Sequence, residues 1–221
     1  EQVAAYENTL KEYVIVNEKG ENLYSLKNYL SNSDSFNKFM GYIVGSNLLM
    51  TESEAFNFRS MLNQKDAALH QKNSYETQIT SLGCQNESMQ LSMSSIGYQI
   101  TSLNLANGKL NKNDDANEIR NNDDIIRNLS DQQDNIKNQK DLLNTQNTQL
   151  SSFKDDSEKQ KYEIELQINH IKSKKDQYKK QVKQYYKEYL NKSEELVLRK
   201  KYAPVNYLTN GEIIKGFNEY G

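Results

Sequence analysis

Large apolar residues recur along the middle of the chain at alternating spacings of four and three, from Tyr75 to Leu110. With Ile79 taken as heptad position a, the a and d positions are mostly Ile, Leu and Met. This 3.5-residue repeat keeps one stripe of a helix facing a partner helix, as in a coiled coil. The stretch "TESE" at 51–54 is typical of a capping box at a helix start. The pattern therefore predicts a first coiled-coil helix over 51–110.

A second heptad run follows in a different phase and continues to about residue 201. Its d positions begin with Leu129, Ile136, Leu143 and Leu150. Its middle is weaker, because five successive a positions are polar: Gln133, Lys140, Asn147, Lys154 and Lys161. This run predicts a second coiled-coil helix over 116–201.

The two runs together define the candidate functional residues of the chain, which are the side chains expected to face the partner helix. Asn86 and Asn107 occupy a positions, where a polar residue is either tolerated in a marginal seam or specifies the register. The predicted seam residues are Ile79, Leu82, Asn86, Met89, Met93, Ile96, Ile100, Leu103, Leu129, Ile136, Leu143, Leu150, Ile164, Ile168, Ile171, Tyr178, Val182 and Tyr185.

The two heptad phases do not join, because "ANGKLNKNDDANE" at 106–118 interrupts them. Gly108 and the neighbouring Asn residues favour a turn, and Asp115 with Glu118 resembles a fresh helix start. The simplest architecture is an all-α antiparallel coiled-coil hairpin with its tip at 111–115. The alternative is two helices that each pair in parallel with another chain. In the hairpin, a tip near 113 sets residue 61 beside about residue 166.

The two ends of the chain have a different character. Residues 1–50 predict a small mixed α/β cap, with a short helix, a strand at "YVIV", a turn at "EKGEN" and a capped helix in "SNSDSFNKFMGYI". We expect the end of the longer second helix to pack against this cap. At 202–221, Pro204 predicts the end of the helix. Asn210-Gly211 predicts a type I′ turn, so this segment is expected to be a β-hairpin stub that leads into a missing domain.

Composition supports a thin helical protein. The 28 basic and 30 acidic residues nearly balance, which argues against disorder, since disordered chains usually pair low hydrophobicity with a large net charge. The single cysteine, Cys84, allows no internal disulfide. The longest apolar run, 39–50, is too short to span a bilayer. Because the chain begins with Glu1, we interpret it as a segment of a longer protein.

Residues that could carry chemistry are sparse. His70, His170 and Cys84 fall on outward heptad positions without metal-ligand spacing, so we expect surface side chains and no metal, cofactor or catalytic residue. The Lys-rich tract 172–180 is interleaved with tyrosines, but several of these belong to the seam, so no nucleic-acid partner is expected. The acidic tip region, 111–134, suits either a basic partner or a soluble loop. The expected partner is a protein of unknown identity, and a hairpin can also form a homodimer.

The C-terminal stretch "YLTNGEIIKGFNEYG" at 207–221 resembles the lead-in to the repeats of bacterial Rhs/YD-repeat proteins. The match rests on Gly211, Phe217, Asn218, Tyr220 and Gly221. This resemblance implies a large secreted or wall-associated protein in which the coiled coil is an upstream spacer. The function expected from it is a non-enzymatic spacer or interaction segment at the cell surface or outside the cell, with a cytoplasmic location as the alternative.

A second resemblance links 22–54 to the coiled-coil region of PcsB/CwlO-type peptidoglycan hydrolases, through Leu30, Ser33, Ser35 and Phe36. It departs from that pattern, since only a short stretch precedes the segment in this sequence and no hydrolase domain is present in it. It implies the alternative function, a regulatory coiled coil that restrains a cell-wall hydrolase under the control of a membrane partner.

Overall fold

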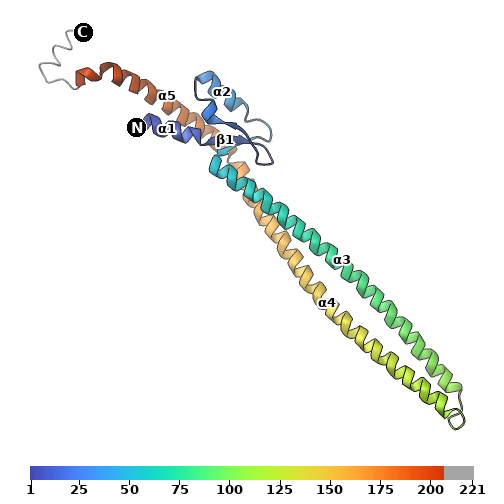
Figure 1. Ribbon diagram of the computed structural model, residues 1–221. Helices are drawn as coiled ribbons and strands as arrows, with labels where there is room; N and C mark the ends of the chain where they lie inside the picture. The colour runs from blue at the N-terminus through green and yellow to red at the C-terminus, as the bar shows by residue number, and fades with distance from the viewer. Residues whose placement is uncertain (207–221) are drawn as a thin grey trace. The chain divides into compact units, whose positions relative to one another are not determined.

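The computed structural model describes residues 1–206, and three long helices dominate it (Figure 1). The described part of the chain forms two compact units. We call Glu1–Gln64 together with Ile164 onward the mixed unit, and Lys65–Glu163 the hairpin unit. The elements are α1 Gln2–Lys11, β1 Tyr13–Val16, β2 Asn22–Ser25, the 3-10 helix η1 Leu26–Asn28, α2 Ser33–Gly41, β3 Leu48–Thr51, α3 Glu52–Lys109, α4 Ala116–Ser173 and α5 Lys175–Asn206.

The mixed unit contains a three-stranded antiparallel sheet in the order β2-β1-β3. Ile15 of the central strand pairs with Tyr24 of β2 and with Leu49 of β3. All four residues of β1 are buried, so both faces of this strand are covered. The predicted strand at "YVIV" is therefore confirmed, and it is the centre of the sheet.

The turn between β1 and β2 is built by Asn17 and Gly20. The Asn17 side-chain oxygen accepts from the backbone N–H groups of Lys19 and Glu21 at 3.0 and 2.9 Å. Gly20 has φ +78°, a left-handed conformation that only glycine adopts without strain. Arg59 then donates to the Gly20 carbonyl at 2.9 Å and so ties the turn to α3.

Replacing Gly20 with alanine is expected to destabilise the mixed unit by about 2–3 kcal/mol. A Cβ atom there would lie 2.5 Å from Arg59 Cγ, in addition to the strain of the positive φ. Gly45→Ala is the matched control, because Gly45 has φ +58° and nothing within 4 Å of the added Cβ. Urea denaturation of both variants should show the larger loss for Gly20→Ala, and equal losses would contradict the proposed clash.

Two predicted helix starts are present with their side-chain caps. Asn32 caps α2 by accepting from the Ser35 N–H at 2.8 Å. Thr51 caps α3 by accepting from the Glu54 N–H at 3.2 Å, which is half of the predicted capping box. The Glu54 carboxylate accepts instead from the hydroxyl of Tyr178, a residue far along the chain.

The core of the mixed unit joins the sheet to the C-terminal helices. Its fully buried side chains include Phe39, Phe58, Leu10, Ile15, Leu26 and Leu49. Ile164, Ile168, Tyr178, Val182 and Tyr186 belong to the same cluster. The second helical run therefore packs against residues 1–50 as expected, and the sheet and the helices share one core.

The hairpin unit is formed by α3 and α4 running antiparallel, which confirms the predicted hairpin (Figure 1). At the tip, the Asp115 carboxylate accepts from the Asn111 backbone N–H at 2.9 Å, and this bond closes the turn before α4. The register is shifted slightly from the predicted one, since Asn86 lies opposite Asn144 and Lys72 opposite Glu158. These pairs centre the turn near residue 115 instead of 113.

Two features of the second helical run differ from its prediction as one helix ending at Pro204. The helix is interrupted at Lys174, where the Ser173 hydroxyl donates to the His170 carbonyl at 2.6 Å and competes with the helical ladder. Helix α5 then continues to Asn206 and includes Pro204. A proline within a helix removes one backbone donor and its ring crowds the carbonyl four residues earlier, yet here the helical backbone continues two residues beyond it. The predicted β-hairpin at 207–221 lies outside the described residues.

Candidate functional site

A buried tyrosine cluster connects three elements of the mixed unit. Tyr178 of α5 donates its hydroxyl to a Glu54 carboxylate oxygen of α3 at 2.5 Å. The ring of Tyr13 in β1 packs edge-on against the Tyr178 ring, with centroids 6.2 Å apart. Tyr13 and Tyr178 are both buried. This cluster therefore fastens α5 to the sheet and to the start of α3.

The cluster shifts the ionisation of both tyrosines. Burial, followed by the charges of Tyr185, Glu54 and Glu12, raises the pKa of Tyr13 to about 12. Burial also raises the pKa of Tyr178, and the hydrogen bond that it donates to Glu54 adds to the rise. Both hydroxyls therefore keep their protons to a higher pH than an ordinary tyrosine, and Tyr178 acts as the hydrogen-bond donor to Glu54.

These shifts predict alkaline destabilisation of the mixed unit between pH 10 and 12. Tyrosines of the unfolded chain ionise near pH 10, whereas folded Tyr13 keeps its proton to about pH 12. The unfolded state thus binds fewer protons in this window, so stability is complete below pH 10 and falls by about 2 kcal/mol by pH 12 through Tyr13 alone. Urea midpoints measured from pH 8 to 12 should fall less steeply for Tyr13→Phe than for the wild type.

The exposed Tyr162 provides the control for this pH series, because its side chain is 60% exposed. Tyr162→Phe is expected to leave the alkaline slope of the wild type unchanged. An identical slope in wild type and Tyr13→Phe would contradict the assignment of the effect to Tyr13.

A second aromatic contact was missed by the heptad pattern. Tyr186 stacks on Phe36 of α2 with ring centroids 3.8 Å apart and an interplanar angle of 10°. Tyr186 is buried, whereas the predicted seam residue Tyr185 is partly buried beside Tyr6. After the interruption at Lys174, α5 therefore presents two adjacent tyrosines to the mixed unit, an arrangement that one continuous heptad register does not describe.

The predicted seam residues divide between the two units. Those from Ile79 to Leu150 lie in the hairpin unit, and every one is partly or fully buried, with Ile96 the most buried at 9% exposed. Those from Ile164 to Tyr185 lie in the mixed unit, as part of its core or packed against it. Burial in α3 follows the predicted register from Ile79 to Asn107, with residues between these positions mostly exposed.

Several polar a positions of α4 reach across to α3, among them Gln133, Lys140 and Lys154. The Gln133 amide donates to the Met93 backbone carbonyl at 3.0 Å, beside Gly97, where an added Cβ would make an ordinary contact 3.4 Å from the Gln133 nitrogen. Further polar pairs across the hairpin include Lys140 with Gln90, Lys154 with Glu76, Lys72 with Glu158, and Asn86 with Asn144.

Asn107 is the better positioned of the two seam asparagines. Its side chain donates to Asp123 at 2.9 Å and accepts from Asn122 at 2.7 Å. The Asn86 amide oxygen is buried without a partner, and its nitrogen lies 3.4 Å from the Asn144 oxygen. These contacts support register specification at Asn107 more strongly than at Asn86.

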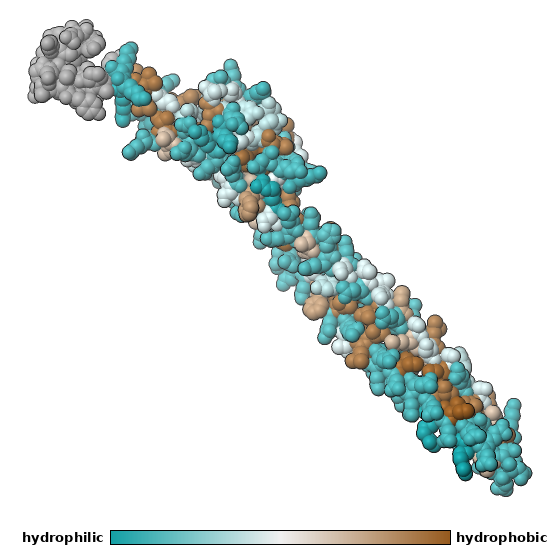
Figure 2. Space-filling view, in the orientation of Figure 1, coloured by the Kyte–Doolittle hydropathy of each residue, from teal (hydrophilic) through white to brown (hydrophobic). Residues whose placement is uncertain are grey.

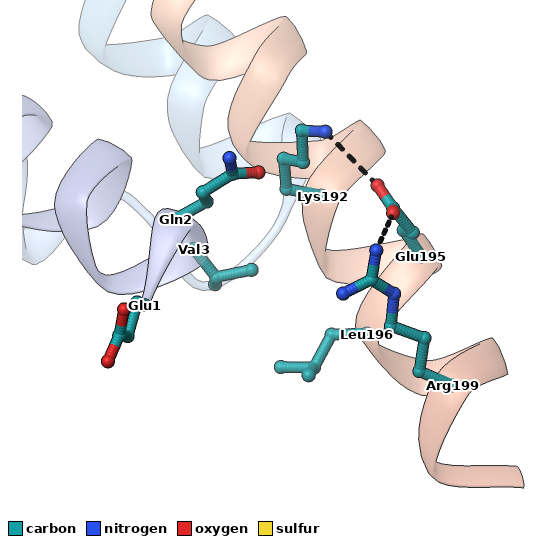
Figure 3. A pocket seen from close by; sticks show the side chains of 7 residues that line it. All are labelled: Glu1, Gln2, Val3, Lys192, Glu195, Leu196 and Arg199. Atoms are coloured by element: carbon teal, nitrogen blue, oxygen red, sulfur yellow. Dashed lines mark hydrogen bonds and ion pairs between the residues drawn. The ribbon is translucent and has the colours of Figure 1, made fainter. Parts of the chain in front are cut away.

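A shallow hollow of about 320 Å³ lies between the start of α1 and the last turns of α5 (Figure 3). Glu195 accepts from Lys192 at 3.1 Å and from Arg199 at 2.7 Å on the same helix. The hydrogen bond from Lys192 and the charges of Lys192 and Arg199 lower the pKa of Glu195. The hollow is therefore flanked by an ion-pair network of one helix surface, in which one carboxylate is shared by two cations.

His70, His170 and Cys84 are all exposed, as expected from their outward heptad positions. In the part of the chain that the structure describes, no three His, Cys, Asp or Glu side chains gather as a metal site would require. Within the same residues, none of the helices combines the length and the apolar character that crossing a bilayer demands.

Large apolar side chains also lie at the surface of the hairpin helices, as Figure 2 shows for one face. Leu91, Tyr98 and Leu105 of α3 are 71, 77 and 63% exposed and are seven residues apart. They all fall on heptad position f, on the side of α3 opposite the seam. We call these three residues the outer stripe. The outer stripe could have been recognised from the sequence, because its residues repeat in the same heptad register as the seam.

Comparison with protein-family models, with curated proteins and with solved structures finds no match to this chain. The resemblances to Rhs/YD-repeat proteins and to hydrolase-associated coiled coils therefore rest on the residues quoted for them.

Proposed function

We propose that the chain is a non-enzymatic spacer and interaction segment of a large bacterial cell-surface or secreted protein of the Rhs/YD-repeat type. The observation that carries the proposal is the hairpin unit, in which α3 and α4 pair through one narrow seam and a series of polar contacts. The stretch of α3 from Lys65 to Lys109 is about 65 Å long at about 1.5 Å per residue. Two paired helices of this length form a long unit with a large surface, although few of their residues are buried.

The polar contacts favour a spacer that keeps a defined register. A seam of leucines alone would tolerate sliding by one heptad, because the same side chains would meet after seven residues. The pairs Asn107 with Asp123 and Gln133 with the Met93 carbonyl are each made at only one register. Sliding would leave these polar groups without their partners, so the unit holds its length under load.

The spacer role is tested by deleting one heptad from each helix. Removing 86–92 together with 138–144 takes out segments that lie opposite each other and keeps both heptad phases. We expect this double deletion to fold with wild-type helicity and to keep surface display of the parent protein. Deleting 86–92 alone is the control, and it should weaken the hairpin because the polar pairs on the two sides of the deletion can no longer form in one register. Equal stability of the two deletions would contradict a register-specific spacer.

The surface setting is supported by the resemblance at 207–221, and an antibody against the chain tests it. Labelling of intact cells of the source organism is the expected result. Labelling only after permeabilisation would overturn this part of the proposal. Catalytic turnover of cell-wall or nucleotide substrates by the purified chain would overturn the non-enzymatic role.

The regulatory alternative is distinguished by a binding experiment. The stretch 22–54, which resembles the hydrolase-associated region, forms β2, η1, α2 and β3 and buries Phe36 against Tyr186. Titration of the chain with an FtsX-like extracellular domain should show no binding for a spacer. Saturable binding that is lost on changing exposed residues of this stretch would favour the regulator.

A further inference from the structure

We propose that the outer face of α3 is a dimerisation surface, on which a second copy of this chain packs antiparallel. This dimer does not depend on the proposed cell-surface setting. It rests on the outer stripe, on the residues beside it and on the charge of the same face.

The outer stripe is flanked by small residues. Heptad positions b and c lie on either side of position f on a helix surface, and between the stripe residues they hold Ser94, Ser95, Thr101 and Ser102. The face thus alternates one large side chain with a pair of small hydroxyl residues at half-heptad intervals. Such alternation is what interdigitating helices need, because large side chains of one helix fill the space above small residues of the other.

The alternation selects an antiparallel partner. A parallel two-fold pair is necessarily in register, so Tyr98 would meet Tyr98 of the second copy and the serines would face one another across a gap. An antiparallel two-fold pair can be offset by half a heptad. Tyr98 then packs over Ser94 and Ser95 of the second copy, and Leu91 packs over Thr101 and Ser102 of that copy.

The charges of this face agree with self-association. The 25 residues from Cys84 to Gly108 contain one charged side chain, Glu87, whereas the 25 residues from Ala116 to Lys140 of α4 contain nine. An uncharged, partly apolar face is complementary to the identical face of a second copy. In the antiparallel pair, Glu87 also lies at the end where Lys109 of the second copy is found, whereas a parallel pair would bring the two Glu87 side chains together.

The area of the face fits a reversible dimer. The three side chains of the outer stripe expose on the order of 400 Å² in each copy, which is the size of patch that marks interaction sites. Two copies with their small flanking residues would bury about 1,000 Å² in total, at the low end of specific interfaces. We therefore expect a dissociation constant in the micromolar range.

Sedimentation equilibrium of the full chain from 1 to 200 µM tests the proposal. The wild type should pass from monomer to dimer, and Tyr98→Glu should raise the dissociation constant at least tenfold. Because Tyr98 is 77% exposed, circular dichroism of this variant should match the wild type. Tyr162→Glu changes a tyrosine of α4 that is 60% exposed and should leave the dimer intact.

A mixed-disulfide experiment determines the orientation. The wild type, with its exposed Cys84, is mixed with the double variant Cys84→Ser, Lys109→Cys and oxidised. The half-heptad offset places residue 84 opposite residue 109 of the other copy, so a disulfide between the two different chains is expected. A disulfide between two wild-type chains through Cys84 would overturn the antiparallel arrangement. A wild type that stays monomeric at 200 µM, or a dimer that Tyr98→Glu does not weaken, would overturn the surface itself.

Discussion

Tyr186→Ala is expected to lower the free energy of unfolding of the mixed unit by about 3–5 kcal/mol. The Tyr186 ring is 6% exposed and stacks on Phe36 with centroids 3.8 Å apart, so its removal leaves a cavity between α5 and α2. The lost aromatic contact adds to the lost burial. Because the chain has two units, hydrogen exchange of peptides from β1 is the suitable measurement, and it should accelerate strongly in this variant.

Two further variants make this prediction specific. Tyr186→Phe keeps the stacked ring and should retain most of the stability. Tyr162→Ala removes a side chain that is 60% exposed in the hairpin unit and should leave the exchange of β1 unchanged. If Tyr186→Ala slowed or barely altered this exchange, the stack would contribute little and α5 would be held mainly by other contacts.

Ile96→Asp is expected to destabilise the hairpin unit by about 2–4 kcal/mol, because it places a carboxylate in the apolar seam without a partner. Ile96 is 9% exposed and lies in the middle of the paired helices. Thermal unfolding followed at 222 nm should begin at a lower temperature. Exchange of peptides spanning 90–103 should rise, while exchange of β1 should change little.

Leu142→Asp is the control for the seam, since Leu142 is 65% exposed on α4. We expect a change within about 0.5 kcal/mol, as for most surface substitutions. A loss as large as that of Ile96→Asp would mean that burial does not distinguish the two positions, and the hairpin would then be held by more than its seam.

The hairpin could be predicted because its signals are local. A heptad register depends only on the order of residues along a helix, and burial along α3 follows the predicted positions from Ile79 to Asn107. The caps at Asn32 and Thr51 and the turn at Asn17 likewise use neighbours within four residues. Such contacts can be inferred from a short stretch of sequence without knowing what packs on it.

Strands β2 and β3 were not predicted, because four-residue strands carry little signal. "LLMT" at 48–51 ends an apolar run, and short apolar runs suit a strand or a buried helix equally. It becomes a strand because β1 offers its free edge, where Leu49 pairs with Ile15. The partner lies more than thirty residues away, so no local pattern contains the information.

The sequence by itself determined the two heptad phases, the tip between them and the separate character of the first fifty residues, because these follow from spacing and turn chemistry. Only the tertiary structure decided which tyrosines of α5 are buried and where the Glu54 carboxylate finds its donor. Tyr178 and Glu54 are 124 residues apart, and their contact exists only after the returning helices fold against the sheet. Side chains brought together from distant segments depend on the whole fold, whereas a periodic stripe depends on one helix.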